Sequence, residues 1–307
     1  MNLHYNSRSY PSLQEYIITE NDEGNLYGKR FDFAHEVDST VLRVLESAHI
    51  QSIINRFADV LVSYESGTDI SSGIVIDKNN FPEIFQVLQH CCKTLGIRIP
   101  HAVVSSSMQG INAYASGTVD MPYLLISDLA TKLLTLDELC FIIGHECGHL
   151  AMEHLVYHFI GKKLYSLGTR IPVVGPALAK TLGLPLNTWS RYSEITCDRA
   201  GFICCGDLKT AQRALMKLES GFANVSDVDL DVYVEQSLSS LENMKVGVVK
   251  EYFFDHPLTP KRLKALDLFS QSELYYRVTG KMAPNGTVLM SDIVLKEKVD
   301  ALLTVLK

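Results

Sequence analysis

The segment from Thr135 to Met152 constrains the fold more than any other part of this sequence. Thr135 is followed three residues later by Glu138, which is the pattern of a capping box at the start of a helix. A strongly apolar run comes next, and Gly161 offers a place for the helix to end. We therefore expect one helix to run from this cap to about Ile160, with the rest of the chain packed around it.

The same helix carries His145, Glu146 and His149 within its apolar stretch. Residues four apart lie on one face of a helix, so the two imidazoles can hold a metal ion together. Zinc is the expected metal, because this spacing pairs two ligands with a glutamate that can act as base toward the attacking water. A surface helix with two unrelated histidines is the alternative, but unpaired polar side chains among apolar residues would be costly to bury.

A catalytic zinc needs a third protein ligand, and the segment SRYSEITCDRAG offers the best candidate. Glu194 and Asp198 are four residues apart, again on one helical face. We expect Glu194 to bind the metal and Asp198 to accept a hydrogen bond from a ligand imidazole, which would orient that ring. The alternative is a solvated acidic pair, which would be mildly repulsive without a nearby cation.

Other residues that could bind a metal fit this set less well. Cys147 lies on another side of the helix from the two histidines, and Cys197 is expected to be a packed small residue. His154 and His158 lie off the ligand face and are expected to contact neighbouring elements. His256, in DHPLTPKR, has three open roles, as a metal ligand, as a donor to the transition state, or as a core histidine before a helix.

Composition and charge exclude several classes of protein. The net charge of −7 lacks the basic footprint of nucleic-acid binding. The 7 cysteines show no CxxC spacing, and the N-terminus lacks the apolar core of a signal peptide, so we expect no disulfide framework and a cytoplasmic location. No segment has the about 20 apolar residues of a transmembrane helix. Residues 171–189 come nearest, as a partly helical excursion with a peripheral membrane contact as one option.

Apolar spacing and turn residues predict the remaining elements. Short strands are expected at residues 101–105, 111–118 and 123–126, and a short helix after Ser127. Thr259 is expected to cap a helix that has Pro260 in its first position. Further helices are expected at 40–64, 82–95, 190–205, 208–219, 228–244 and 259–269, with a last amphipathic helix capped by Ser291. The expected fold class is α+β, mainly helical, with a small mixed sheet.

Four segments, INAYASG, HECGHLAMEH, EITCD and DHPLTPKR, taken in this order, resemble the HtpX-like and CAAX-prenyl-endopeptidase-like zinc metallopeptidases, which are gluzincins. The resemblance covers about residues 97–270 and implies a gluzincin-type domain built on the HExxH helix. It also implies His145, His149 and Glu194 as the metal ligands and Glu146 as the base. Asp198 matches the acidic residue of the family's ExxxD motif.

The resemblance assigns two further segments. Asn112, Ala113 and Tyr114 match an Asn-Ala-aromatic segment on the strand that binds substrate backbone beside the site. An extended peptide can add to an exposed strand edge by main-chain hydrogen bonds, although without the resemblance these residues would indicate only an interior strand. The family's corresponding histidine lies near the active site, which favours His256 as a donor to the transition state.

Three parts of the chain are predicted from these observations. Residues 1–95 form an N-terminal helical segment, residues 96–270 the metallopeptidase domain, and residues 271–307 a tail with an amphipathic helix. The membrane members of the family carry transmembrane helices around the catalytic helix and this sequence has none, which weakens membrane-protein quality control and prenyl-protein processing as roles.

The predicted function is that of a zinc-dependent endopeptidase with one Zn²⁺ per chain and polypeptide substrates. Glu146 would act as general base and then return the proton to the leaving amine. Two alternatives stay open, a zinc-holding chaperone or scaffold with latent proteolysis and a zinc hydrolase of a non-peptide amide. The intact Glu146 argues against the first, because a scaffold needs no base. The sequence does not indicate an oligomeric state.

Overall fold

The structure is a computed structural model that describes residues 33–40, 73–117, 122–155, 175–243 and 256–304. The described chain is α+β and mainly helical with one small sheet, as predicted. Most of the helix expected at 40–64, and His158, lie outside the described residues.

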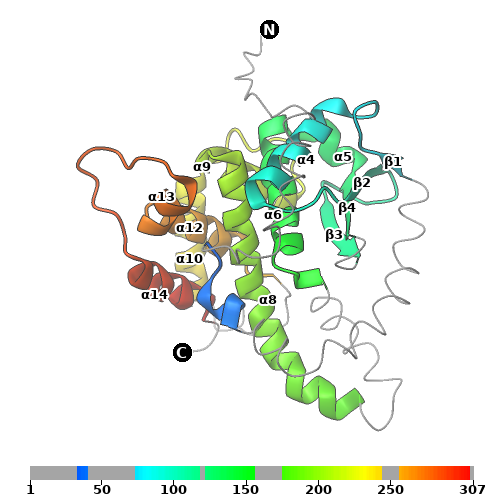
Figure 1. Cartoon of the computed structure of the whole chain (residues 1–307). Helices are drawn as coiled ribbons and strands as arrows, with labels where there is room; N and C mark the ends of the chain where they lie inside the picture. The colour runs from blue at the N-terminus through cyan, green and yellow to red at the C-terminus, as the bar shows by residue number, and fades with distance from the viewer. Residues whose placement is uncertain (1–32, 41–72, 118–121, 156–174, 244–255, 305–307) are drawn as a thin grey trace.

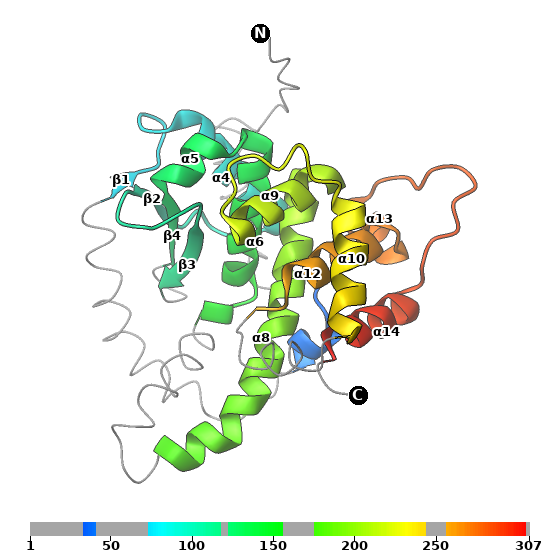
Figure 2. The same ribbon diagram turned by 180° about the vertical axis from the view of Figure 1, so that it is seen from behind.

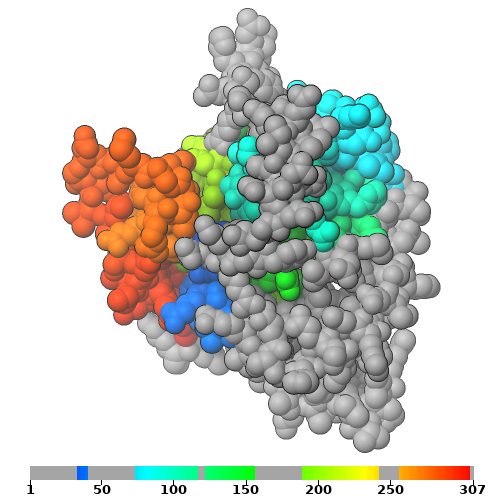
Figure 3. Space-filling view, viewed as in Figure 1, coloured from blue at the N-terminus to red at the C-terminus, as the bar shows by residue number. Residues whose placement is uncertain are grey.

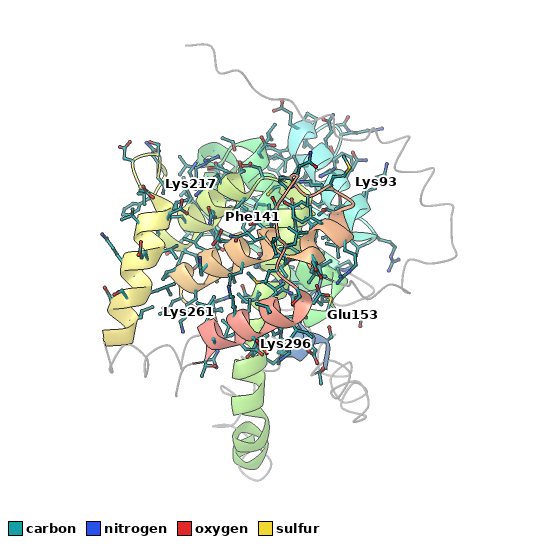
Figure 4. All side chains as sticks on the ribbon, turned by 90° about the vertical axis from the view of Figure 1, so that its left-hand side faces the viewer. Lys93, Phe141, Glu153, Lys217, Lys261 and Lys296 are labelled. Carbon is teal, nitrogen blue, oxygen red and sulfur yellow. The ribbon has the colours of Figure 1, made fainter. Side chains whose placement is uncertain are left out.

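Helix α6 (Leu136–Ala151) is the centre of the fold. The predicted capping box is present, because the Glu138 N–H donates to Thr135 Oγ1 (3.2 Å) and the Thr135 N–H donates to Glu138 Oε2 (2.9 Å). The middle of the helix is buried, and Figure 4 shows Phe141 in the interior of the molecule.

The expected continuation of this helix to Ile160 is wrong, because α6 ends at Ala151. Glu153 has a φ of 56°, a left-handed conformation that cannot continue a right-handed helix. The break turns the chain so that His154 is fully buried instead of following the helix axis.

The sheet has four strands in the order β1-β2-β4-β3 and lies beside α6. The strands β2 and β4 are parallel, whereas β1 and β3 run antiparallel to their neighbours, so the sheet is mixed as predicted. Strand β3 forms one edge and packs against α6 (Figure 1). The strand bounds are β1 (Ile74–Val75), β2 (His101–Ser105), β3 (Ala113–Gly117) and β4 (Pro122–Ser127).

Helix α8 (Gly175–Cys205) crosses α6 on the side away from the sheet (Figure 2). It begins earlier than the expected Ser190 and includes most of the segment predicted to be only partly helical. Pro176 falls in its first turn, where a missing N–H leaves no helical bond unmade.

Small residues let α6 and α8 approach closely. A Cβ added to Gly144 would lie 2.8 Å from Cys204 Cβ, and one added to Gly148 would lie 2.9 Å from Ala200 Cβ. Such distances leave no room for any side chain on this face of α6, so the backbones of the two helices are in near contact. The short distance between the two backbones lets side chains of α6 and α8 on either side of this contact touch one another.

The remaining helices agree with most of the predicted ranges. Among the described residues, helix α13, the helical residues 36–39 and strand β1 were not predicted. The expected cap at Thr259 is wrong, because Thr259 is already helical and Leu258 precedes it without a side-chain cap. The predicted cap is present at Ser291, which accepts a bond from the Val294 N–H. Their bounds are α4 (Pro82–Leu95), α5 (Asp128–Leu133), α9 (Leu208–Ser220), α10 (Leu230–Asn243), α12 (Thr259–Ser270), α13 (Glu273–Thr279) and α14 (Asp292–Leu303).

One large core connects most of the described elements, and a smaller cluster of Met216, Val225 and Leu230 lies apart from it. The large core includes Phe33 near the N-terminus, Phe141 in α6 and Leu303 at the end of α14. The division of the chain into three parts stays a prediction. All 7 cysteines are free and buried, and Cys147 Sγ lies 4.0 Å from Cys92 Sγ. None of the described helices combines the length and apolar character that a membrane crossing requires.

Candidate active site

The three predicted ligands come together between α6 and α8. His145 Nε2 and His149 Nε2 are 3.2 Å apart, and each lies 3.4 Å from one oxygen of Glu194. All three side chains are buried, and their candidate ligand atoms lie within 4.8 Å of one another. Ligands about 2.0–2.1 Å from a tetrahedral zinc ion lie roughly 3.3 Å apart, so this spacing fits a metal with three protein ligands and one open position.

Charge at the site also fits a cation. Burial opposes ionisation of Glu194, but His256, His145 and His149 hold the pKa of this carboxyl well below its usual range. Its Oε2 is buried, and nitrogens of His256 (3.0 Å), Arg262 (3.3 Å) and His145 (3.4 Å) surround it without a hydrogen bond of good geometry among the described residues. Burial lowers the pKa of His149 to about 4, so this imidazole is neutral, which is the form that binds metals.

His145 has a carboxylate directly behind it. Its Nδ1 lies 3.0 Å from Asp198 Oδ1, which is the contact expected for Asp198. Burial would disfavour a charged His145, but Asp198 and Glu194 outweigh it and raise the pKa of this imidazole to about 10. The site therefore favours positive charge at the position between these carboxylates.

Arg262 on α12 neutralises Asp198 and was not assigned from the sequence. Its Nε and Nη2 donate to the two oxygens of Asp198 (2.9 and 2.7 Å), and its Nη1 donates to Glu219 (2.7 Å). A usable signal existed, because Arg262 ends the DHPLTPKR motif and the predicted acidic pair needed a cation.

His149 has a longer chain of partners, most of which sequence reasoning missed. Its Nδ1 lies 3.1 Å from His154 Nδ1, and His154 Nε2 lies 3.1 Å from both oxygens of Asp38. Trp189 donates to Asp38 Oδ1 (2.7 Å). Cys197 Sγ, packed beside His154 at 3.5 Å, makes His149, His154 and Cys197 a second group that could hold a metal. As predicted, His154 contacts neighbouring elements.

Glu146 lies between the histidines and the edge of the sheet. The Ala115 N–H donates to its Oε2 (2.7 Å), which ties the carboxyl to strand β3. Burial raises the pKa of Glu146 to about 7, assisted by the charge of Glu194 and opposed by His145. A pKa near neutral suits a group that must both accept and release a proton.

The segment Asn112–Tyr114 leads into the strand that touches Glu146. The backbone of Asn112 pairs with Ser127 on β4, through bonds of 3.0 Å to its hydroxyl and 2.8 Å to its N–H. Main-chain groups alternate in direction along a strand. Ala113 and Ala115 therefore turn theirs toward the edge beside α6, which pairs with no other strand of the described residues, whereas Tyr114 turns its groups toward β4.

His256 also lies at the site. Its Nδ1 is 3.0 Å from Glu194 Oε2, and 52% of the side chain is exposed. This exposure does not fit a core histidine. The Glu194 charge raises the pKa of His256, so the ring is favoured in its protonated, donating form.

The sequence matches peptidase family M48 over residues 78–269. It is 26% identical over 270 residues to the plastoglobule-localized metallopeptidase 48, chloroplastic, of Arabidopsis thaliana, covering 84% of this chain and 77% of that protein. A protease HtpX homolog of Thermoplasma volcanium is 24% identical (64% and 74% covered), and one of Archaeoglobus fulgidus is 23% identical (59% and 66% covered). No solved structure matches the chain significantly.

Proposed function

This chain belongs to peptidase family M48 and is a metalloprotease, and we propose that it uses one zinc ion held by His145, His149 and Glu194. The observation that carries the proposal is the convergence of these three buried side chains beside Glu146. Two imidazoles and a carboxylate are a donor set that suits zinc and leaves a fourth position open. When bound, zinc would supply charge that polarises the scissile carbonyl.

Glu146 is proposed as the general base. The bond from the Ala115 N–H fixes its carboxyl beside the ligand group, and its raised pKa lets it take a proton from the attacking water. The same carboxyl would then give that proton to the leaving amine. Asp198, locked by Arg262, would hold the ring of His145 in the ligand orientation.

The edge of β3 beside α6, to which no described strand pairs, is proposed as the place where the polypeptide substrate binds. The main-chain N–H and C=O of Ala113 point outward from this edge, whereas those of Asn112 and Tyr114 face β4 on the other side of the strand. A peptide added there would run past Glu146 with its backbone paired to the enzyme. This arrangement favours peptide substrates over the non-peptide amides considered above.

His256 is proposed as a donor to the oxyanion that forms on the scissile carbonyl. It is partly exposed at the mouth of the site and cationic beside Glu194. Removing one such donor typically slows turnover by about 10²–10³-fold. His256→Phe is therefore expected to lower kcat by this amount while zinc content and the unfolding temperature stay unchanged. Loss of zinc would instead make His256 a ligand.

The proposed function is tested by Glu146→Gln, whose amide has nearly the same shape but cannot accept the proton. Cleavage of an unstructured protein should fall by at least about 10²–10⁴-fold, because the same group serves in two proton transfers. Elemental analysis should still find one zinc per chain. His145→Ala, which should lose the metal, is the control for zinc content. Cleavage by the Gln variant at the wild-type rate would contradict the mechanism.

A chaperone or scaffold role with latent proteolysis is not favoured, because base and ligand group are assembled together. We propose a cytoplasmic location, although the relative from Arabidopsis thaliana is named for the plastoglobule. Residues 171–189 remain the proposed place of a peripheral membrane contact. Cell fractionation in the native organism, followed by a salt wash of any membrane-bound fraction, distinguishes these locations.

A further inference from the structure

The N-terminal segment 33–38 reaches the metal site although it precedes the stretch that matches the peptidase family, residues 78–269. Figure 1 shows this segment, in blue, beside α8 and α14, and Figure 3 shows it next to the red residues of α14. The His35 N–H donates to Thr196 Oγ1 (3.0 Å), and Arg199 Nη1 donates to the Phe33 carbonyl (2.9 Å). Both partners lie on α8 within the turns that carry Glu194 and Asp198.

These two anchors place Asp38 deep in the protein. Its carboxylate has no exposed surface and receives bonds from His154 and Trp189. Burial opposes ionisation, but His154, Thr196 and Trp189 together lower the pKa of Asp38, so it stays charged. A buried charge of this kind is costly unless its partners are fixed, which makes the arrangement a built feature of the fold.

We propose that Asp38 acts through His154 to orient His149 as a metal ligand, so that segment 33–38 completes the metal site. The inference rests on the proposed function, and Asp38 and His154 are positioning residues. His149 Nε2 faces Glu194 and His145, so its Nδ1 must carry the proton and donate to His154 Nδ1. His154 then carries its own proton on Nε2, which faces Asp38.

The opposite arrangement of protons is disfavoured by Asp38. If a neutral His154 donated from Nδ1 to His149, its bare Nε2 would face the carboxylate without a proton between them. The charge of Asp38 thus selects the tautomer of His154, and His154 selects that of His149. The ring of Trp189 packs edge-on against His154 (5.4 Å, 87°) and restricts its rotation.

The test compares zinc affinity, by competition with a chromophoric chelator, and the visible spectrum of the cobalt-substituted full-length protein. Asp38→Asn is expected to weaken zinc binding by about 10–100-fold and to alter the cobalt spectrum, which reports ligand geometry. Glu36→Gln, an exposed residue of the same segment, is the matched control and should change neither. Wild-type affinity and spectrum in a folded Asp38→Asn variant would overturn the proposal.

His154 provides an independent arm in case Asp38→Asn fails to fold. His154→Phe removes the acceptor and should weaken zinc binding at least as much as Asp38→Asn, and adding Asp38→Asn to it should cause little further loss. His154→Asn places an acceptor near the former Nδ1 and should restore part of the affinity. The proposal would be overturned if His154→Asn restored no zinc affinity and the losses from His154→Phe and Asp38→Asn were fully additive. His154 and Asp38 would then only pack the site.

Metal stoichiometry separates the remaining outcomes. One zinc per wild-type chain is expected, with Cys197→Ala retaining it. Two zinc ions per chain, one of them lost in Cys197→Ala, would mean that His149, His154 and Cys197 form a metal site themselves and would overturn the positioning role. A wild-type chain without any zinc affinity would overturn the proposed function first, whatever Asp38 does.

Discussion

The two histidines of α6 are supported in different ways. Behind His145, one carboxylate makes direct contact, and Asp198 is in turn locked by Arg262. Behind His149, the imidazole of His154 lies between the His149 ring and the carboxylate of Asp38. Both supports end in a buried carboxylate, but only the first lies wholly inside the family-matched stretch.

The two histidines are therefore held by contacts of different origin, one set within the helical core and one set that includes the N-terminal segment. The His145 support joins α6, α8 and α12, and α8 packs against both of the other helices. The His149 support needs a chain break after α6 and a segment docked from the N-terminus. We therefore expect damage on the first side to affect the whole fold, and damage on the second side to affect mainly the metal site.

The largest effect is expected from Arg262→Met, which removes the two bonds from the guanidinium to the buried carboxylate of Asp198 and leaves it only the His145 imidazole as a partner. Breaking one partner of a buried pair costs about 3–5 kcal/mol, so the free energy of unfolding should fall by that amount in urea titrations of the metal-free protein. Adding Asp198→Asn should recover part of the loss, because it removes the buried charge that has lost Arg262. If Arg262→Met alone were as stable as wild type, the support behind His145 would not contribute more to the fold than the support behind His149.

A smaller effect, shared by both sides, is expected from Gly148→Ala. The new Cβ would lie 2.9 Å from Ala200 Cβ, so α6 and α8 must move apart. Overpacking of this kind costs about 1–3 kcal/mol and should also weaken zinc binding, because Glu194 moves with α8. Adding Ala200→Gly to Gly148→Ala removes the Cβ that clashes. The double variant should regain part of the stability in thermal unfolding and part of the zinc affinity in chelator competition. Unchanged zinc affinity in the single variant would show that the helix spacing does not set the ligand geometry.

The effect that is smallest near neutral pH concerns the docking of the N-terminal segment, because it develops only in acid. Burial and the charge of Arg199 outweigh Asp300 and lower the pKa of His35 to about 3. The unfolded chain then binds a proton that the folded chain does not, so stability falls as the pH drops from about 6.5 toward 3, by at most about 1.4 kcal/mol per pH unit. His35→Gln should lose less stability over this range in parallel urea titrations. Equal slopes for both proteins would show that His35 does not titrate on unfolding.

Much of the fold and the centre of the site followed from local patterns. The capping box, the spacing of His145 and His149, and the pairing of Glu194 with Asp198 depend on residues three or four apart, which helical geometry places together in any helix. The helices α4, α9 and α14 were equally accessible, because their caps and apolar faces are local features.

Tertiary structure decided the rest. The end of α6 at Ala151 could not be predicted from helical periodicity, because the break is stabilised by burial of His154 against groups far away in the chain. Asp38 lies 116 residues from His154 in sequence, and no local pattern marks it. The sequence alone determined which residues can bind a metal, because that depends on donor chemistry and helical spacing. Only the packing of α6 against α8 and of segment 33–38 decided which side chains surround each candidate ligand, because those contacts exist only in the folded chain.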